Sequence, residues 1–299
     1  MINLLQQTRD LCKLYNIVPT KALGQNFLID ENVLNDIMLE VKKERQKYKK
    51  LNILEIGGGL GFLTNKLLDV ADKVFVVEKD ENLFKGLKRI EKVSNNKLIV
   101  ELGDALDLFN RDERIYGKLR SFFNGEDYIV VANIPYNITS ILIRKFLSEK
   151  EYYPKDLILM IQKEVGDRVC GKNNDNSVFT VVTKFYCDTN ILFYVNRKPF
   201  HPSPEVDSVV ISLMRNDKYI NDIKKIDKNI DPEDFFKFVN AGFLNRRKML
   251  YHNIAAVYRV GKDKIKEILI KDNLNEKIRA QDLSVSDWIS LWYNIKYEK

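Results

Sequence analysis

The sequence has few of the residues that build disulfide frameworks and zinc sites. Among 299 residues there are three cysteines, Cys12, Cys170 and Cys187, and two histidines. The cysteines are isolated and no C-x-x-C spacing occurs, which argues against a disulfide scaffold and against a Cys/His zinc site. We therefore expect no bound metal and a reducing, cytoplasmic environment.

Long apolar runs are also absent. No segment reaches the roughly 20 apolar residues of a membrane-spanning helix, and residues 1–10 lack the apolar core of a signal peptide. Hydrophobic residues still make up 45% of the chain, with 16 Phe and 14 Tyr, which is enough to bury a large core. The sequence predicts a soluble protein with one large and one smaller domain, and no membrane partner.

Positive charge exceeds negative charge only modestly. Lys and Arg number 49 against 42 Asp and Glu, which gives a net charge of +7. Such a balance favours an anionic partner, most often nucleic acid, but many unrelated enzymes share it.

From about residue 51, short β-branched segments alternate with helical patterns such as Phe62–Leu68 and Ile141–Leu147. This alternation predicts a parallel sheet covered by helices on both faces, and the last two strands predict an antiparallel end. The predicted strands are Ile53–Ile56, Val74–Val77, Leu98–Glu101, Tyr128–Ala132, Leu157–Ile161, Ile191–Val195 and Val209–Leu213.

The pattern changes after residue 215. Residues 216–229 are polar and rich in Lys and Asp, which predicts a linker. Asp231 and Pro232 then offer an N-cap and a first helical residue, and Phe235–Ile254 predicts one helix that two further helical stretches follow. The predicted fold class is α/β, with a doubly wound, Rossmann-like domain before a small all-α domain. The two predicted domains are residues 1–215 and 216–299.

A glycine-rich segment lies where the first strand should turn into the first helix. Gly57, Gly59 and Gly61 allow a tight bend and a close approach to a ligand, with helix N–H groups pointing at it. A dinucleotide site would need a small residue in the last position of G-x-G-x-x-G, where this chain has Phe62. The G-x-G-x-G spacing is instead typical of methyltransferases, although a tight turn without a ligand stays an alternative.

Carboxylates follow the next two strands. Glu78 directly follows Val74–Val77, where a carboxylate can accept both hydroxyls of a ribose. Asp104 follows the third strand and could accept a hydrogen bond from an adenine amine. Because the glycine loop and both carboxylates end three consecutive strands, together they predict a nucleoside-binding site.

Three further motifs complete a resemblance to a known family. Residues 133–136 read Asn-Ile-Pro-Tyr, residues 23–28 read Leu-Gly-Gln-Asn-Phe-Leu, and residues 200–208 read Phe-His-Pro-Ser-Pro-Glu-Val-Asp-Ser. With the glycine loop and the two carboxylates, they make residues 20–215 similar to the KsgA-type (RsmA) ribosomal RNA adenine dimethyltransferases, of which the Erm enzymes are cousins. The resemblance implies a seven-stranded class I methyltransferase domain that uses S-adenosylmethionine, releases S-adenosylhomocysteine and needs no metal.

The resemblance also implies the roles of individual residues. The cofactor contacts would be Asn26, Leu28, Gly57, Gly59, Gly61, Glu78, Asp104 and Asn133. The catalytic residues would be Asn133, Pro135, Tyr136 and Phe200. Without the resemblance, residues 133–136 could be only a turn after a strand.

The chemistry of adenine supports these catalytic roles. Its exocyclic amine is a poor nucleophile because the lone pair is delocalised into the ring. If the Asn133 side-chain oxygen and the Pro135 carbonyl accept the two amine hydrogens, the nitrogen becomes tetrahedral and the lone pair is freed. Tyr136 and Phe200 could stack on the two faces of a base that has left its own stack.

A basic segment marks the second predicted domain. Arg246, Arg247 and Lys248 lie in the predicted helix, where a charge run is by default a solvated face. With an RNA substrate, contacts to phosphates become the better interpretation. Residues 243–250 and 279–284 resemble C-terminal motifs of the KsgA-type family, although Gln281 stands where Glu is usual.

These C-terminal matches favour the small-subunit enzyme over the Erm type. The resemblance implies N6,N6-dimethylation of two adjacent adenosines in the 3′-terminal hairpin loop of 16S rRNA, within the small ribosomal subunit or its precursor. We expect the enzyme to be cytoplasmic and to act as a monomer, because action on a large RNA particle needs no second copy. This role links the chain to subunit biogenesis. Three alternatives stay open: Erm-type methylation of 23S rRNA, a non-catalytic ribosome assembly or transcription factor on the same fold, and a dehydrogenase, which Phe62 disfavours.

Overall fold

The computed structural model describes residues 3–19, 24–109, 114–149, 151–172, 176–226 and 231–297. By backbone contacts the chain divides into two compact units. The first unit comprises Met1–Gly166 and Asn190–Met214, and the second comprises Asp167–Thr189 and Arg215–Lys299. Residues 167–189 thus group with the C-terminal helices, and the functional division at residue 215 stays a proposal.

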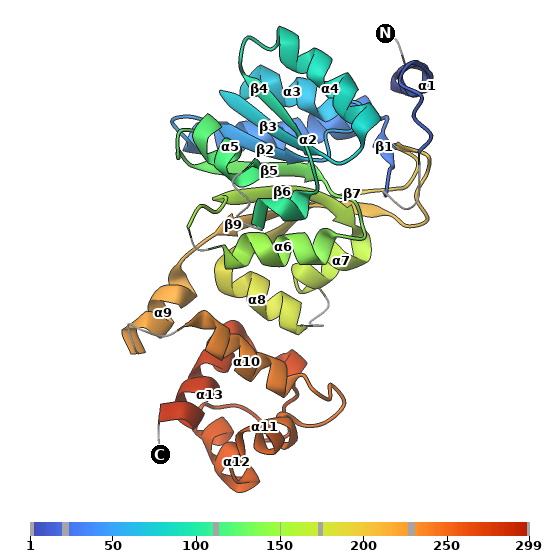
Figure 1. The fold of residues 1–299 in the computed structure, drawn as a ribbon. Helices are drawn as coiled ribbons and strands as arrows, with labels where there is room; N and C mark the ends of the chain where they lie inside the picture. Colours follow the sequence, from blue (N-terminus) through green and yellow to red (C-terminus); the bar gives the residue numbers. More distant parts are fainter. Residues whose placement is uncertain are drawn as a thin grey trace. The chain divides into compact units, whose positions relative to one another are not determined.

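A seven-stranded sheet in the order β4-β3-β2-β5-β6-β9-β7 is the framework of the first unit (Figure 1). Its strands are β2 (Asn52–Ile56), β3 (Lys73–Glu78), β4 (Leu98–Leu102), β5 (Tyr128–Asn133), β6 (Asp156–Gln162), β7 (Cys187–Val195) and β9 (Ser208–Arg215). The five strands from β4 to β6 are parallel, and β9 runs antiparallel to β6. The structure confirms the predicted α/β fold class and the antiparallel end, although β7 begins at Cys187 rather than Ile191.

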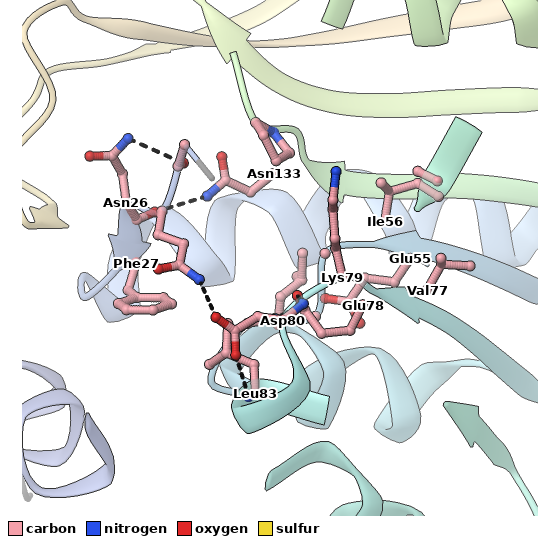
Figure 2. Close-up of a pocket in the computed structure, with 18 of the residues that line it drawn as sticks. Asn26, Phe27, Glu55, Ile56, Val77, Glu78, Lys79, Asp80, Leu83 and Asn133 are labelled. Carbon is pink, nitrogen blue, oxygen red and sulfur yellow. Dashed lines mark hydrogen bonds between the residues drawn. The ribbon is translucent and has the colours of Figure 1, made fainter. Parts of the chain in front are cut away.

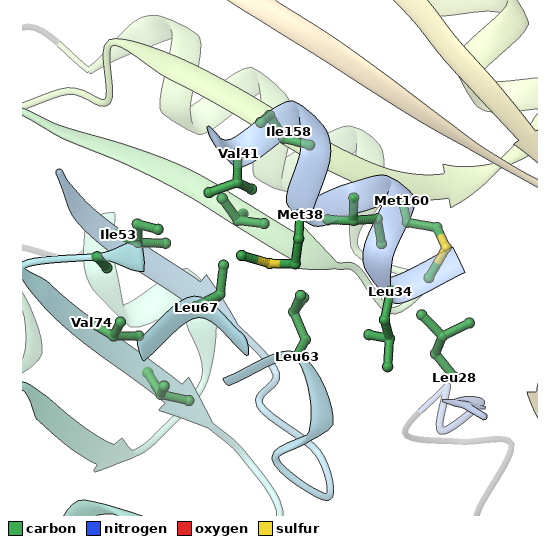
Figure 3. Close-up of a cluster of buried hydrophobic side chains, with 14 of the residues drawn as sticks. Leu28, Leu34, Met38, Val41, Ile53, Leu63, Leu67, Val74, Ile158 and Met160 are labelled. Atoms are coloured by element: carbon green, nitrogen blue, oxygen red, sulfur yellow. The ribbon is translucent and has the colours of Figure 1, made fainter. Parts of the chain in front are cut away.

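The helices of this unit are α1 (Leu4–Leu14), α2 (Glu31–Lys47), α3 (Phe62–Val70), α4 (Glu81–Val93), α5 (Ile115–Phe122), α6 (Thr139–Ser148) and most of α7 (Lys163–Val169). Helices α2 and α3 point apolar side chains such as Met38 and Leu67 at the sheet (Figure 3), where they meet Ile53 of β2 and Met160 of β6. Because the strands are buried on both faces, they appear in the sequence as continuous apolar runs. This core holds the strand ends in fixed positions.

Two very short strands join distant parts of the first unit. Strand β1 (Phe27–Leu28) pairs with β8 (Phe200–His201), so that Leu28 lies opposite Phe200. Two of the recognised motifs therefore lie side by side, although more than half of the chain separates them.

The second unit is helical. Its helices are α8 (Val178–Tyr186), α9 (Lys218–Ile226), α10 (Pro232–Gly242), α11 (Leu250–Tyr258), α12 (Lys262–Lys271) and α13 (Val285–Tyr297). Helix α10 begins as predicted, with the Asp231 carboxylate accepting from the Glu233 N–H at 3.2 Å. Within the described residues, no helix has the length and apolar character needed to cross a membrane.

The predicted linker is wrong over Lys218–Ile226, which form helix α9. Ile223 is fully buried and Tyr219 stacks on Phe185 of α8, with ring centroids 6.2 Å apart. These two apolar residues at i, i+4 spacing dock a helix that is otherwise rich in lysine and polar residues. Of the rest of the predicted linker, residues 216 and 217 lie outside any helix or strand, and residues 227–229 lie outside the described residues.

The single helix predicted over Phe235–Ile254 is also wrong, because a turn at residues 243–249 separates α10 from α11. The buried Asn253 side chain donates to the carbonyls of Gly242 at 2.6 Å and Asn245 at 3.1 Å. It thereby satisfies carbonyls that a continued helix would have bonded internally. Phe243 stacks on Trp288, with centroids 5.7 Å apart, and closes the turn.

At Gly242, the last residue of α10, the backbone packs directly against the side chain of Trp288. A β-carbon there would overlap Cη2 of the fully buried Trp288. We expect Gly242→Ala to lower the free energy of unfolding, because overpacking costs about 1–3 kcal/mol and helix propensity returns only about 1 kcal/mol. Urea unfolding measures the change. Gly261→Ala is the matched control, since a β-carbon at Gly261 meets no atom within 4 Å; an equal loss in both variants would contradict the packing explanation.

Candidate functional site

A cavity in the first unit lies at the carboxyl ends of β2, β3, β4 and β5 (Figure 2). Parallel strands direct their carboxyl ends to one edge of the sheet, so residues from distant parts of the chain meet there. The predicted site residues that line the cavity are Asn26, Leu28, Gly57, Gly59, Glu78, Asp104, Asn133 and Pro135. Three predicted site residues of this unit, Gly61, Tyr136 and Phe200, are not part of its wall.

The glycine loop forms one wall through backbone conformations that favour glycine. Gly57, Gly59 and Gly61 have φ values of 72°, 55° and 84°. The Gly57 N–H donates to the Val77 carbonyl at 2.9 Å, and Gly61 is the N-cap residue of α3. A β-carbon on Gly57 would meet no atom within 4 Å. Gly57 therefore leaves open space at the wall of the cavity, as a closely approaching ligand requires.

Two backbone N–H groups hold the carboxylate of Glu78 in place. Its Oε2 accepts from the Gly59 N–H at 3.0 Å and its Oε1 from the Asp80 N–H at 2.9 Å. The side chain is only 5% exposed, and this burial raises the pKa of the carboxyl group. Since each carboxylate oxygen has more than one lone pair, both can still accept a hydroxyl from a ligand.

Asp104 lies after β4 in an ion pair. Its Oδ2 is 2.8 Å from Nζ of Lys79, and its Oδ1 accepts from the Leu106 N–H at 2.9 Å. Desolvation raises its pKa, but the bonds from Lys79 and Leu106 outweigh this effect and leave the pKa lowered. Asp104 therefore stays ionised and able to accept a further hydrogen bond.

Glu55 is a cavity residue to which the sequence patterns assign no role. It is 1% exposed near the end of β2, and its Oε2 accepts from Oγ1 of Thr64 at 2.7 Å. Burial, with a further contribution from the charge of Glu78, raises its pKa to about 8. The signal available in the sequence was its place two residues before the glycine loop.

Asn133 ends β5 with its side-chain amide fixed. Its Nδ2 donates to the Asn26 carbonyl at 3.3 Å (Figure 2). Its Oδ1 accepts no hydrogen bond from the described part of the chain. The amide therefore offers an acceptor beside the cavity, as the predicted contact with an amine hydrogen requires.

The carbonyl of Pro135 is not free for its predicted role. It accepts from the Ile138 N–H at 3.2 Å and from Oγ1 of Thr139 at 3.2 Å, in the turn that leads into α6. Both lone pairs of the oxygen are thus used. The neighbouring Ile134 carbonyl accepts no hydrogen bond from any residue that the structure describes, so its lone pairs stay available.

The two predicted stacking residues lie away from the cavity wall. The Tyr136 hydroxyl lies 2.8 Å from Oγ of Ser208, and burial raises its pKa. Phe200 is 3% exposed and belongs to the same apolar cluster as Leu28 and Met160. Its pairing with β1 buries the ring, so a base could stack on Phe200 only after that ring had moved.

The basic cluster belongs to the second unit. Arg246, Arg247 and Lys248 are exposed in the turn between α10 and α11, not on a helix as predicted. Arg246 donates to the Asn176 carbonyl at 3.3 Å, whereas Arg247 and Lys248 form no ion pair with a described residue. Desolvation and three neighbouring lysines lower the pKa of His252. These lysines are Lys262, Lys248 and Lys266.

Over the described ranges, no three His, Cys, Asp or Glu side chains lie in an arrangement that could hold a metal ion.

A family model and several known proteins are similar to this chain over most of its length. The model of the family described as ribosomal RNA adenine dimethylase matches residues 19–292. The chain is 35% identical over 285 residues to the ribosomal RNA small subunit methyltransferase A of Clostridioides difficile, covering 94% of this chain and 92% of that protein. It is 36% identical over 275 residues to the Fusobacterium nucleatum protein of the same name, covering 91% and 95%.

Two solved structures are similar over most of the chain. A dimethyladenosine transferase from Plasmodium falciparum has a TM-score of 0.68 at 26% identity, covering 88% of this chain and 94% of that one. The 23S rRNA methyltransferase ErmE also has a TM-score of 0.68, at 21% identity, covering 90% and 99%. At that identity, the second likeness supports the fold alone.

Proposed function

The chain belongs to the ribosomal RNA adenine dimethylase family, and from this premise we propose that it dimethylates N6 of two adjacent adenosines in the 3′-terminal hairpin loop of 16S rRNA. The observation that carries the proposal is the cavity in which Glu78, Asp104 and Asn133 meet the glycine loop. The substrate would be the small ribosomal subunit or its precursor, and the enzyme would act as a monomer in the cytoplasm. The names of the bacterial relatives support the choice of the small subunit.

S-Adenosylmethionine supplies, when bound, a methyl group on a positively charged sulfur. The residues of the cavity fit this cofactor. Glu78 would accept the ribose hydroxyls, Asp104 would accept from the adenine amine, and the loop from Gly57 to Leu60 would pack against the ligand through its backbone. Asn26 and Leu28 would complete the contacts from the opposite wall, since they also line the cavity.

Asn133 would act on the substrate base. Its Oδ1 would accept one hydrogen of the adenine amine, and the Ile134 carbonyl would accept the other. Both contacts favour a tetrahedral nitrogen, whose lone pair is available for in-line attack. Tyr136 and Phe200 would stack on the flipped base after Phe200 leaves its buried position. Positioning and electrostatics then supply the acceleration, without a nucleophilic side chain.

The basic turn would contact RNA phosphates. The charges on Arg247 and Lys248 are not neutralised by described carboxylates, and Lys248, Lys262 and Lys266 lie close enough to His252 to lower its pKa further, after the larger effect of desolvation. We expect replacement of Arg246, Arg247 and Lys248 by alanine to weaken RNA binding and to reduce the slope of log K against log salt by about 2–3. Filter binding at several salt concentrations measures this slope. An unchanged slope would make the cluster an ordinary solvated surface.

Binding of the cofactor should be linked to a proton on Glu55. Because its pKa is about 8 in the free protein, Glu55 is mostly protonated at neutral pH. A cation in the cavity favours the ionised form, so binding of S-adenosylmethionine should release a proton. Its affinity should therefore fall as pH decreases below 8, by at most about tenfold per unit. Calorimetry in buffers of different ionisation enthalpy measures the released proton. Glu55→Gln should remove the released proton and the pH dependence close to pH 8, whereas a decrease caused by protonation of Glu78 should remain. Proton release near pH 8 that persists in the variant would assign it to another group.

The proposed function is tested by methyl transfer from labelled S-adenosylmethionine. Small-subunit particles that lack the modification are the substrate, and free 16S and 23S rRNA are the controls. We expect label in the 16S rRNA of the particles. Label in 23S rRNA alone would assign the chain to the Erm type, and no label in any RNA would favour a non-catalytic role.

A further inference from the structure

Gln25 ties the segment before β1 to the start of α4. Its Nε2 donates to Oδ2 of Asp80 at 2.9 Å, across 55 positions of the sequence (Figure 2). Asp80 is itself fixed, because its Oδ1 caps α4 by accepting from the N–H groups of Asn82 at 2.8 Å and Leu83 at 3.0 Å. Its own N–H donates to Glu78. Gln25 is therefore bonded to one of the most constrained side chains beside the cavity.

The residue after Gln25 sets the orientation of Asn133. The Asn26 carbonyl can only accept, and it accepts from Nδ2 of Asn133 at 3.3 Å. If the Asn133 amide rotated by half a turn, its Oδ1 would face that carbonyl oxygen and the two acceptors would repel each other. The Asn26 carbonyl therefore selects the rotamer in which Oδ1 is the available acceptor.

The Asn26 carbonyl needs anchors on both sides to do this. On its C-terminal side, β1 pairs with β8, and the Ile29 N–H donates to the Pro199 carbonyl at 2.8 Å. On its N-terminal side, the bond from Gln25 to Asp80 holds the chain. Gly24 then passes close to the Asn-Ile-Pro-Tyr motif, since a β-carbon on Gly24 would lie 3.1 Å from Cβ of Pro135.

We propose that Gln25 is a positioning residue: by its bond to Asp80 it holds the Asn26 carbonyl where that carbonyl orients the Asn133 amide toward the substrate amine. The inference rests on the proposed function of Asn133 as the acceptor for an amine hydrogen. It assigns to Gln25 an effect on the rate of transfer, not on the capture of the cofactor.

The test compares Gln25→Ala with a matched bond elsewhere. Gln6→Ala removes a similar bond, from Nε2 to Oδ1 of Asp10 at 3.0 Å, within α1. Gln25→Ala should lower kcat about tenfold and change the Kd of S-adenosylmethionine by less than about threefold, whereas Gln6→Ala should leave both within about twofold. Similar kcat values for the two variants, or a Kd effect without a kcat effect, would overturn the proposal.

A double variant in which residues 25 and 80 exchange donor and acceptor should restore the kcat that the single variant loses. Gln25→Glu alone places two carboxylates in contact and should lower kcat at least as far as Gln25→Ala. Asp80→Asn in the same chain keeps an oxygen for the helix cap and places an amide nitrogen where Oδ2 was, so the bond re-forms with its direction reversed. The double variant should recover kcat to within about threefold of the wild type. Failure of this folded double variant to recover would refute the role of the pair, whereas a wild-type protein that methylates no adenine would refute the proposed function instead.

Discussion

Replacing Asn133 with alanine should lower kcat for methyl transfer by at least about 10²–10³-fold, which is the usual effect of removing one group that stabilises a transition state. The amine nitrogen gains positive charge as it attacks, and its hydrogens then bind an acceptor more strongly than in the free base. Only interactions that strengthen in the transition state accelerate the reaction. Single-turnover transfer to RNA measures the loss, and calorimetry measures the binding of S-adenosylmethionine, which should stay nearly unchanged.

Asn137 offers the matched control for this variant. It lines the same cavity from a position just after the Asn-Ile-Pro-Tyr motif, and it is exposed. Asn137→Ala should change kcat by less than about threefold. If Asn133→Ala lowered the affinity for the cofactor as much as it lowered kcat, Asn133 would act only through the cofactor contact that the resemblance also implies, and its catalytic role would be wrong.

Replacing Glu78 with glutamine should weaken the binding of S-adenosylmethionine and S-adenosylhomocysteine by about 10–100-fold, since hydrogen bonds to a charged group contribute about 1.5–3 kcal/mol. The amide keeps one acceptor, but its NH₂ group would face the N–H of either Gly59 or Asp80, which now donate to the two carboxylate oxygens. Both the ribose contact and the shape of the glycine loop are lost together. At saturating cofactor, kcat should be close to that of the wild type.

Calorimetric titration with S-adenosylhomocysteine tests the Glu78 prediction without turnover. Glu81→Gln is the control, because Glu81 is exposed in the first turn of α4 and does not line the cavity. Burial raises the pKa of Glu78, so the affinity of the wild type should fall as pH decreases through that raised pKa. Glu78→Gln should lack this decrease. Equal affinities for Glu78→Gln and the wild type would show that Glu78 does not hold the cofactor.

Local patterns predicted the sheet well. Strand β5 carries Ile129, Val130 and Val131, which are all buried, and such continuous apolar runs are typical of parallel strands that helices cover on both faces. The glycine loop and the strand-end residues Glu78, Asp104 and Asn133 meet at one edge because parallel strands share a direction. The strands, the glycine loop and the strand-end residues depend on local sequence patterns, and they can therefore be predicted from the sequence.

The features that local patterns did not predict depend on contacts between residues far apart in the sequence. The turn after α10 depends on the buried Asn253, and the helix at Lys218–Ile226 docks through Tyr219 and Ile223 among lysines and aspartates. Phe200 is buried by a pairing of two-residue strands that no propensity predicts. For the same reason, the bond from Gln25 to Asp80 becomes visible only once the fold has brought the two residues together.

The nucleoside formed in the RNA tests the central claim most directly. After reaction of unmodified small-subunit particles with S-adenosylmethionine, the RNA is digested to nucleosides and analysed by mass spectrometry, with the Asn133→Ala variant as control. An adenine-N6 dimethyltransferase should form N6,N6-dimethyladenosine at two adjacent positions of 16S rRNA, and the variant should form almost none. Methylation at a ribose hydroxyl or at a pyrimidine carbon, with no methyl group on adenine N6, would contradict the role of the Asn133 site.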